Sequence, residues 1–238
     1  MRFLVFQHLA VEHPGRFRDA WAAAGIAWDT IELDAGDPIP ALEPYDALVV
    51  MGGPMDVWQT EEHSWLRCEM WAIRRWVGML RRPYLGICLG HQLLAQALGG
   101  EVGPAARPEV GLTTIGLTEE GLRDPLLAGF AAQVETFQWH AAEVKRLPKG
   151  AVVLAGNADC RVQAIRCGER AWGFQYHCEI TPATVPEWRA IPAYAAALEQ
   201  ALGSEGAATL EARTAARLPA LEADADRLMR NFLGLLRG

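Results

Sequence analysis

The feature that most restricts the fold of this chain is a cysteine between two glycines, where an apolar run meets a helical pattern. Residues 84–87 (YLGI) are typical of a short buried strand, and residues 89–98 of a helix that ends before Gly99 and Gly100. Cys88 stands at the junction, within the letters GICLG. A strand that turns sharply into a helix needs small neighbours, because side-chain carbons there would collide with the backbone. The segment therefore predicts a strand-to-helix turn that presents a nucleophilic thiol.

The remainder of the chain predicts the sheet to which this turn belongs. Before it, apolar runs at 3–6, 28–33 and 47–51 alternate with helical patterns at 15–24 and 64–80. After residue 101 short runs separated by Gly, Pro and Asn favour antiparallel strands, at 112–117, 151–155, 160–166 and 171–176. We predict an α/β, flavodoxin-like fold, with an open, mostly parallel sheet flanked by helices and a smaller antiparallel section in the second half.

The C-terminal part of the chain returns to helical composition. Residues after Thr181 are rich in Ala, Leu, Glu and Arg, with an interruption at 203–206 and a final apolar stripe that ends at Leu235. The sequence contains no internal repeat, no low-complexity linker and no shift in composition that would divide it. We expect a single domain over 1–238, with C-terminal helices of about 183–238 packed on it.

Composition and charge exclude several classes of function. The net charge of −7 is spread along the chain without a long basic run, which argues against a nucleic-acid partner. No stretch approaches 18 apolar residues, and the first apolar run is too short for a signal peptide, so we expect a cytoplasmic protein that does not span a membrane. Five cysteines without C-x-x-C spacing indicate neither a full disulfide framework nor a zinc site. We expect no metal and no organic cofactor.

A cysteine nucleophile needs a base, and the sequence offers one after the run at 171–176. Residues two apart on an extended strand face the same side, so His177 and Glu179 can lie together while Cys178 faces away. Glu179 would then hold one imidazole nitrogen and leave the other for Cys88. His140, in the letters FQWH, stays open between a cleft and a structural role. The other histidines receive structural or surface roles: His8, His13, His63 and His91.

Two backbone amides are candidates for an oxyanion hole. Leu89 begins the helix after the nucleophile, where N–H groups have no partner inside the helix and the helix dipole favours negative charge. Gly52 and Gly53 follow the run at 47–51, and the carboxyl ends of parallel strands collect ligands. The N–H of Gly53 is the expected second donor, and a plain strand-to-loop turn is the alternative.

Together these segments resemble the class I (triad) glutamine amidotransferases, specifically stand-alone members similar to the amidotransferase domain of GMP synthase. The likeness covers roughly residues 48–181 and is carried by GICLGHQLLAQALGG at 86–100, MGGP at 51–54, FQWH at 137–140 and GFQYHCE at 173–179. It implies a nucleophile at Cys88, a base at His177 and an orienting carboxylate at Glu179. One position departs from the family pattern, because Cys178 stands where the family usually has Pro.

The resemblance also implies how a substrate is held. Gly53 and Leu89 would supply the oxyanion amides, while Gln92 and the backbone around Gln138 and Trp139 would hold the α-amino and α-carboxylate groups of glutamine. The expected reaction is hydrolysis of the glutamine side-chain amide through a γ-glutamyl thioester, with release of ammonia and glutamate. Because the chain carries no phosphate-binding loop, a synthase that accepts the ammonia would be a separate chain.

Two alternatives to this function stay open on the sequence. A hydrolase of γ-glutamyl peptides or γ-glutamyl amines would use the same triad without a partner. A catalytically silent binding or regulatory subunit would keep the fold alone, although all three triad residues are present. Turnover of γ-glutamyl dipeptides in excess of glutamine would favour the hydrolase.

Overall fold

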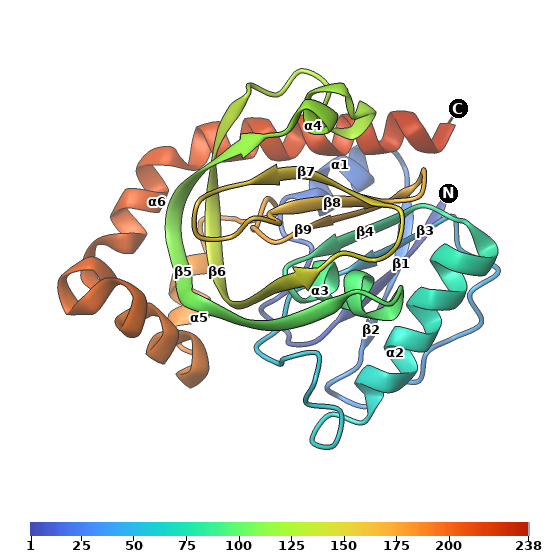
Figure 1. The fold of residues 1–238 in the computed structure, drawn as a ribbon, viewed down its shortest axis with the longest axis horizontal. Coiled ribbons are helices and arrows are strands. Elements are labelled where there is room, and N and C mark those ends of the chain that lie inside the picture. Colours follow the sequence, from blue (N-terminus) through green and yellow to red (C-terminus); the bar gives the residue numbers. More distant parts are fainter. Residues whose placement is uncertain (238) are drawn as a thin grey trace.

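A nine-stranded mixed sheet runs through the computed structural model, which describes residues 1–237 (Figure 1). The strands lie in the order β2-β1-β3-β4-β9-β8-β7-β5-β6. Their bounds are β1 Arg2–Gln7, β2 Ala27–Glu32, β3 Ala47–Val50, β4 Tyr84–Ile87, β5 Glu101–Leu117, β6 Gln133–Arg146, β7 Ala151–Gly156, β8 Ala164–Cys167 and β9 Ala171–Phe174. The helices are α1 Phe17–Ala23, α2 Trp65–Arg74, the π-helix η1 Arg75–Leu80, α3 Leu89–Ala97, α4 Glu119–Arg123, the 3₁₀ turn η2 Pro125–Leu127, α5 Thr184–Arg189 and α6 Pro192–Arg237.

The sheet divides into a parallel and an antiparallel part. Strands β2, β1, β3, β4 and β9 pair in parallel, and β9, β8, β7, β5 and β6 pair antiparallel. Because β1, β3, β4 and β9 are parallel neighbours, their carboxyl ends meet at one edge, where ligands collect in open α/β sheets. The predicted fold class, with its parallel first half and antiparallel second half, is confirmed.

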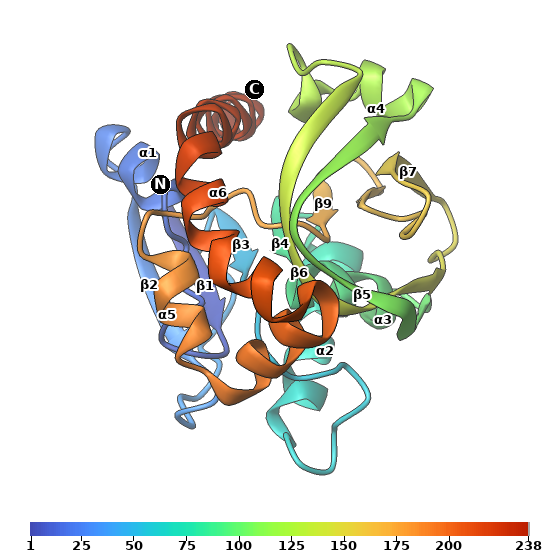
Figure 2. The same ribbon diagram turned by 90° about the vertical axis from the view of Figure 1, so that its left-hand side faces the viewer.

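Helices cover both faces of the parallel part (Figure 2). On one face α1 and α6 bury Phe3 and Val5 of β1, and on the other α2 and α3 bury Leu4 and Phe6. The alternation follows from the period of two along a strand, which sends neighbouring side chains to opposite faces. All four residues are fully buried. Two apolar layers therefore hold the carboxyl ends of the central strands at fixed positions.

The antiparallel part differs from the sequence prediction in the length of its strands. β5 and β6 form a long curved hairpin, whereas only 112–117 was predicted as a strand within it (Figure 1). The register shifts between Pro104 and Glu109. Gly and Pro in this stretch interrupt the alternation of apolar and polar residues by which a strand is recognised. A hairpin can accommodate such residues at bulges. β6 of this hairpin also forms an isolated bridge, between Phe137 and His177, beyond the end of β9.

The helical predictions hold with two differences of detail. The helix predicted over 64–80 is α-helical to Arg74 and continues as a π-helix to Leu80. The predicted interruption at 203–206 is confined to Gly203, which leaves helical geometry at φ 65° and ψ 174° and bends α6. α6 lies beside β5, β6 and α5, and its C-terminal part runs past α1 (Figures 1 and 2).

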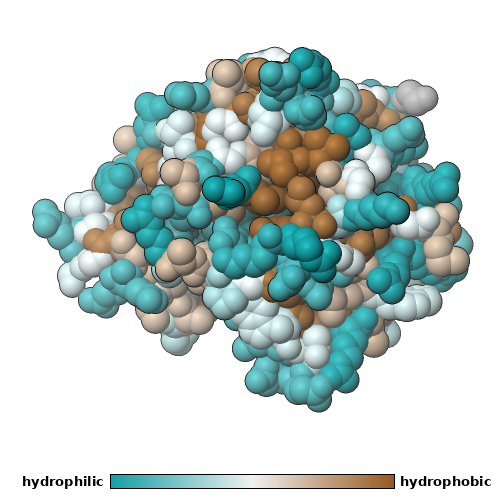
Figure 3. Space-filling view, in the orientation of Figure 1, coloured by the Kyte–Doolittle hydropathy of each residue, from teal (hydrophilic) through white to brown (hydrophobic). Residues whose placement is uncertain are grey.

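The surface shows no membrane-crossing element among residues 1–237, since none of their helices is long and apolar enough to span a bilayer. Figure 3 shows one apolar patch over β7 and β8, with polar side chains around it. Val152 and Val153 of β7 are half-buried.

Gly90 is expected to be the most sensitive glycine of the strand-to-helix turn. A Cβ at this position would lie 2.2 Å from the carbonyl oxygen of Val50, a backbone atom that cannot move without displacing β3. We expect Gly90→Ala to lower the free energy of unfolding by about 3 kcal/mol or more, measured by urea denaturation. Gly78→Ala is the control, because nothing lies within 4 Å of its Cβ position. An equal loss in both variants would contradict the steric explanation.

Candidate active site

Cys88 occupies the strained turn that its flanking glycines predicted. It lies between β4 and α3 with φ 49° and ψ −102°, a left-handed backbone conformation that is uncommon outside glycine. A Cβ on Gly86 would lie 2.5 Å from the carbonyl oxygen of Gly90, so the tight approach of strand and helix requires glycine there. The Cys88 N–H donates to the Phe174 carbonyl of β9 at 2.7 Å. The sheet thus holds Cys88 in this strained conformation. The thiol lies at the edge where the parallel strands end.

His177 and Glu179 form a buried pair beside Cys88. Nδ1 of His177 lies 2.8 Å from Oε1 of Glu179, and both side chains are almost fully buried. Burial alone would lower the pKa of His177, but Glu179 and Cys88 raise it well above the ordinary 6.5. Nε2 of the ring is buried without a hydrogen-bond partner of its own in the described part of the chain. That nitrogen is free to take a proton from the neighbouring thiol.

The pairing arises from a different local structure than the sequence suggested. β9 ends at Phe174, so His177 and Glu179 do not lie on its extension, and the strand-alternation argument for this segment is wrong. His177 instead forms an isolated bridge with Phe137 of β6, with its N–H donating to the Phe137 carbonyl at 2.8 Å. Cys178 packs against the apolar core. The long β6 strand therefore positions the histidine.

The surroundings of the Cys88 sulfur oppose and favour its ionisation at the same time. Burial raises the pKa of the Cys88 thiol above its ordinary value, although the charge of the nearby His177 ring acts to lower it. Nε2 of Gln175 donates to the sulfur at 3.6 Å, and the carbonyl oxygen of Trp139 lies 3.9 Å away. Gln175, a fully buried donor that the sequence analysis did not single out, adds to the stabilisation of a thiolate.

A cavity of about 160 Å³ opens beside the sulfur, smaller than the pockets that hold drug-sized ligands. Five residues predicted for the site line it: Gly53, Cys88, Gln92, Trp139 and His140. Nε2 of Gln92 donates to Gln175 and to the Ala142 carbonyl at 3.1 and 3.2 Å, which fixes its amide at the cavity wall. At the rim, burial raises the pKa of the half-buried Asp56.

The other predicted residues lie behind this wall. Gly52 lies against the imidazole, because a Cβ on it would be 3.1 Å from Cε1 of His177. Leu89 is the first residue of α3, so its N–H lies in the helical turn next to the sulfur. The side chain of Gln138 is fully buried and bonds to Thr136 and Gln163 at 3.0 Å each. The oxyanion and substrate-binding roles stay predictions.

The sequence was compared with models of known protein families. A family model described as glutamine amidotransferase class-I matches residues 19–187, which is most of the chain and includes all three triad candidates. The chain belongs to the class I glutamine amidotransferases.

Individual relatives of this amidotransferase cover much of its length. One of the subunits of the glutamine-hydrolyzing GMP synthase of Saccharolobus solfataricus is 39% identical over 144 residues, which span 60% of this chain and 72% of the relative. A glutamine amidotransferase crystal structure from Methylobacillus flagellatus shares 29% identity with a TM-score of 0.86, covering 98% of this chain and 94% of the other. Another, from Thermotoga maritima, shares 25% identity with a TM-score of 0.84, covering 98% and 97%.

The segment after the family match contributes to the site. Ala193, Tyr194 and Ala197 of α6 line the cavity beside Cys88, although the match ends at residue 187. The Tyr194 hydroxyl donates a hydrogen bond to Oε1 of Glu12. The C-terminal helix is therefore a wall of the cavity as well as a cover of the sheet.

Glu12 and the adjoining aromatic residues were missed by the sequence analysis. Glu12 follows β1, its side chain is buried, and ligating atoms of Glu12, His177 and Glu179 all lie within 4.8 Å of one another. Burial raises the pKa of Glu12. Trp188 of α5 packs edge-on against His177 with ring centroids 4.6 Å apart. The sequence did offer one signal for Glu12, because it is a charged residue in the loop after the apolar run of β1. That loop begins at the same edge of the sheet as the ends of β3, β4 and β9, where ligands collect.

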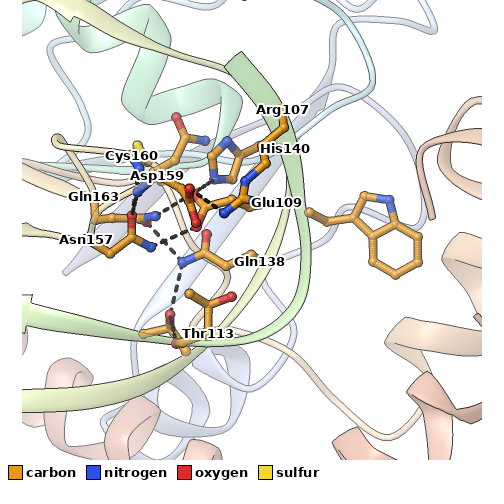
Figure 4. A network of polar contacts seen from close by, with 12 residues as sticks. Arg107, Glu109, Thr113, Gln138, His140, Asn157, Asp159, Cys160 and Gln163 are labelled. Atoms are coloured by element: carbon orange, nitrogen blue, oxygen red, sulfur yellow. Dashed lines mark hydrogen bonds and ion pairs between the residues drawn. The ribbon is translucent and has the colours of Figure 1, made fainter. Parts of the chain in front are cut away.

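A buried polar network supports the cavity wall from the hairpin side (Figure 4). Glu109 of β5 accepts hydrogen bonds from Asn157 at 2.7 Å and from Gln163 at 2.9 Å, and it lies 3.1 Å from Nε2 of His140. Nδ1 of His140 faces the Ala142 carbonyl at 3.0 Å. The network ties β5 to β6 next to Trp139. His140 thus has both of the roles that the sequence left open, since it lines the cavity and braces the hairpin.

Three residues of this region have the types and spacing of a metal cluster, and one of them already has hydrogen-bond partners. Glu109, His140 and Cys160 are buried with ligating atoms within 4.8 Å of one another. The Glu109 oxygens already accept from Asn157 and Gln163. Burial raises the pKa of the Cys160 thiol to about 12. Hydrogen bonds from Asn157 and Gln163 therefore account for the buried Glu109 carboxylate without a metal.

Proposed function

We propose that this chain hydrolyses the side-chain amide of glutamine through a γ-glutamyl thioester on Cys88. The observation that carries the proposal is the strained cysteine next to a buried His177–Glu179 pair, at the mouth of a small cavity. A nucleophile with an adjacent base, itself oriented by a carboxylate, is the arrangement that splits amide hydrolysis into two easier steps. Membership of the class I family supports the same reaction.

In the first half of the reaction, Nε2 of His177 takes the thiol proton and the Cys88 sulfur attacks the amide carbonyl carbon. The oxygen becomes negative and accepts hydrogen bonds from the N–H groups of Gly53 and Leu89. The carbon–nitrogen bond then breaks, His177 returns its proton to the nitrogen, and ammonia leaves.

In the second half, water attacks the thioester and gives a proton to His177. The carbon–sulfur bond breaks, glutamate leaves, and the sulfur receives the proton from the imidazolium. Glu179 holds the ring in one orientation and stabilises its charge throughout. Neither half requires a metal or an organic cofactor. Asp56 at the cavity rim is a candidate partner for the substrate ammonium group.

We infer that the ammonia passes to a separate synthase chain. Several relatives are named as one of the subunits of a glutamine-hydrolyzing GMP synthase, which supports a partner of that kind. We also infer that residues 1–238 act as one domain, since α6 lines the cavity and packs on the sheet.

A second candidate function is hydrolysis of γ-glutamyl peptides or amines. It is favoured by the wall that Ala193, Tyr194 and Ala197 of α6 add beside Cys88, beyond the end of the family match. A leaving group larger than ammonia would contact this wall.

The test measures ammonia, amine and glutamate release from glutamine and a panel of γ-glutamyl compounds. Acid-quenched samples are digested and the Cys88 peptide is searched by mass spectrometry for a γ-glutamyl adduct. Glutamine turnover with the adduct is the expected result, and turnover confined to γ-glutamyl peptides would establish the second candidate. If no substrate reacts and no adduct forms, even with a synthase partner present, a silent regulatory role replaces both proposals.

A further inference from the structure

A second buried histidine–carboxylate pair lies next to the triad and takes no part in the reaction described. His8 follows β1, and its Nε2 lies 2.9 Å from Oε1 of Glu69 on α2, with both side chains fully buried. The ring stacks on Trp65 with centroids 5.4 Å apart and planes 16° apart. A buried ion pair contributes little to net stability, so its retention in the core calls for another explanation.

The other ring nitrogen of His8 reaches the glycine loop. Nδ1 lies 2.8 Å from the carbonyl oxygen of Gly52. A carbonyl oxygen only accepts hydrogen bonds, so Nδ1 carries a proton and donates it. Burial alone would lower the pKa of His8, but Glu69, together with the Gly52 hydrogen bond, raises it. The ring is therefore held at both ends, by Glu69 on one side and by the Gly52 carbonyl on the other.

The Gly52 carbonyl determines where the next amide points. In a trans peptide the C=O and the following N–H point in opposite directions, and no peptide bond among residues 1–237 is cis. With its carbonyl turned toward His8, the Gly52–Gly53 peptide directs the N–H of Gly53 away from His8. Gly53 also lines the cavity next to Cys88, where the substrate oxygen would sit.

Two glycines in succession cannot hold such an orientation alone, because glycine rotates freely about its backbone bonds. They are nevertheless required, since a Cβ on Gly52 would lie 2.4 Å from Oε2 of Glu12 and one on Gly53 would lie 2.9 Å from Cβ of His8. We propose that His8, anchored by Glu69, is a positioning residue that keeps the Gly52–Gly53 peptide turned so that its N–H serves the oxyanion. This inference rests on the proposed function of Cys88.

The decisive variants separate the hydrogen bond from the packing. His8→Leu removes the donor, and the double variant His8→Leu with Glu69→Leu also removes the buried charge, so that the fold keeps an apolar pair in its place. His8→Asn keeps an amide N–H near the position of Nδ1. Glu69→Gln keeps a partner for Nε2 while Nδ1 still donates to Gly52.

We expect both leucine variants to lose ~10²- to 10³-fold in kcat with KM changed only a few-fold, because the lost amide acts on the transition state. His8→Asn should recover ~10-fold of that loss, and Glu69→Gln should stay within a few-fold of the parent. Alkylation of Cys88 by iodoacetamide forms no oxyanion, so its rate should be the same in all four variants. A folded double variant with unchanged kcat, or alkylation that falls in parallel with turnover, would overturn the proposal.

A crystal structure of the double variant supplies a readout that does not depend on turnover. We expect the Gly52–Gly53 peptide to rotate, with its carbonyl no longer directed at position 8. A peptide in the parent orientation would overturn the positioning role even if activity is lost. Turnover that survives Cys88→Ala would instead overturn the proposed function, and the peptide orientation would still test His8.

Discussion

Replacing Cys88 by alanine is expected to lower kcat/KM for glutamine by roughly 10⁵-fold. The sulfur is the atom that forms the thioester, and no neighbouring side chain among the described residues is placed to replace it. Alanine has the same Cβ as cysteine, so the strained backbone at φ 49° is no worse for it and the fold should persist. Ammonia release at glutamine concentrations well below KM, with circular dichroism as the check on folding, measures the loss.

Cys178→Ala is the matched control for that variant. Cys178 lies beside His177 in the sequence but packs against the apolar core, so its loss should change kcat/KM only a few-fold. This control also addresses the position at which the chain departs from the family pattern. Retention of more than about one per cent of activity in Cys88→Ala would show that another group performs the attack.

Replacing Glu179 by glutamine is expected to lower kcat by roughly 10²- to 10⁴-fold and to move the pH profile. Glu179 accepts from Nδ1 of His177 at 2.8 Å and raises the pKa of the imidazole against the effect of burial. Without that charge the pKa of His177 falls. The unprotonated imidazole that takes the thiol proton then persists to lower pH, so the acid limb of kcat/KM shifts down by about one to two pH units.

The pH profile distinguishes this role from a merely structural one. A destabilised but otherwise normal site would lose rate at every pH and keep its acid limb in place. Because Cys88 and His177 titrate as a coupled pair, the limb reports an apparent pKa of the pair rather than of the ring alone. Glu205→Gln, an exposed carboxylate of α6, is the control and should leave both rate and limb unchanged. An unmoved limb in Glu179→Gln would contradict the assignment.

The nucleophile turn was predictable because its signal is local. Strand, glycine, cysteine, glycine and helix follow one another within residues 84–98, and each has a steric reason to stand where it does. The sequence also predicted that His177 and Glu179 lie close together, and they do. The argument assumed that the strand continues through these residues, whereas β9 ends at Phe174. Their geometry depends on a bridge to Phe137, some forty residues earlier in the chain, which no local pattern records.

The supporting residues could not be predicted for the same reason. Tyr194 meets Glu12 across 182 positions of sequence, and His8 meets Glu69 across 61. Each of these side chains, taken alone, resembles an ordinary surface or core residue. The packing of α2 on the sheet brings Glu69 to His8, and the packing of the first part of α6 against β5, β6 and α5 brings Tyr194 to Glu12. The long β5–β6 hairpin escaped prediction because Gly and Pro interrupt its pattern.

The bend at Gly203 separates two functions of α6. Before it, Tyr194 and its neighbours line the cavity, and after it Phe232 packs in the core against Phe3 with ring centroids 6.3 Å apart. The half before the bend therefore meets the cavity as well as an apolar cluster, whereas Phe232 in the half after it meets only the core. We expect exchange of Ala193 and Ala197, which line the cavity before the bend, to change which leaving groups the proposed site accepts, while the packing of Phe232 after the bend stays intact.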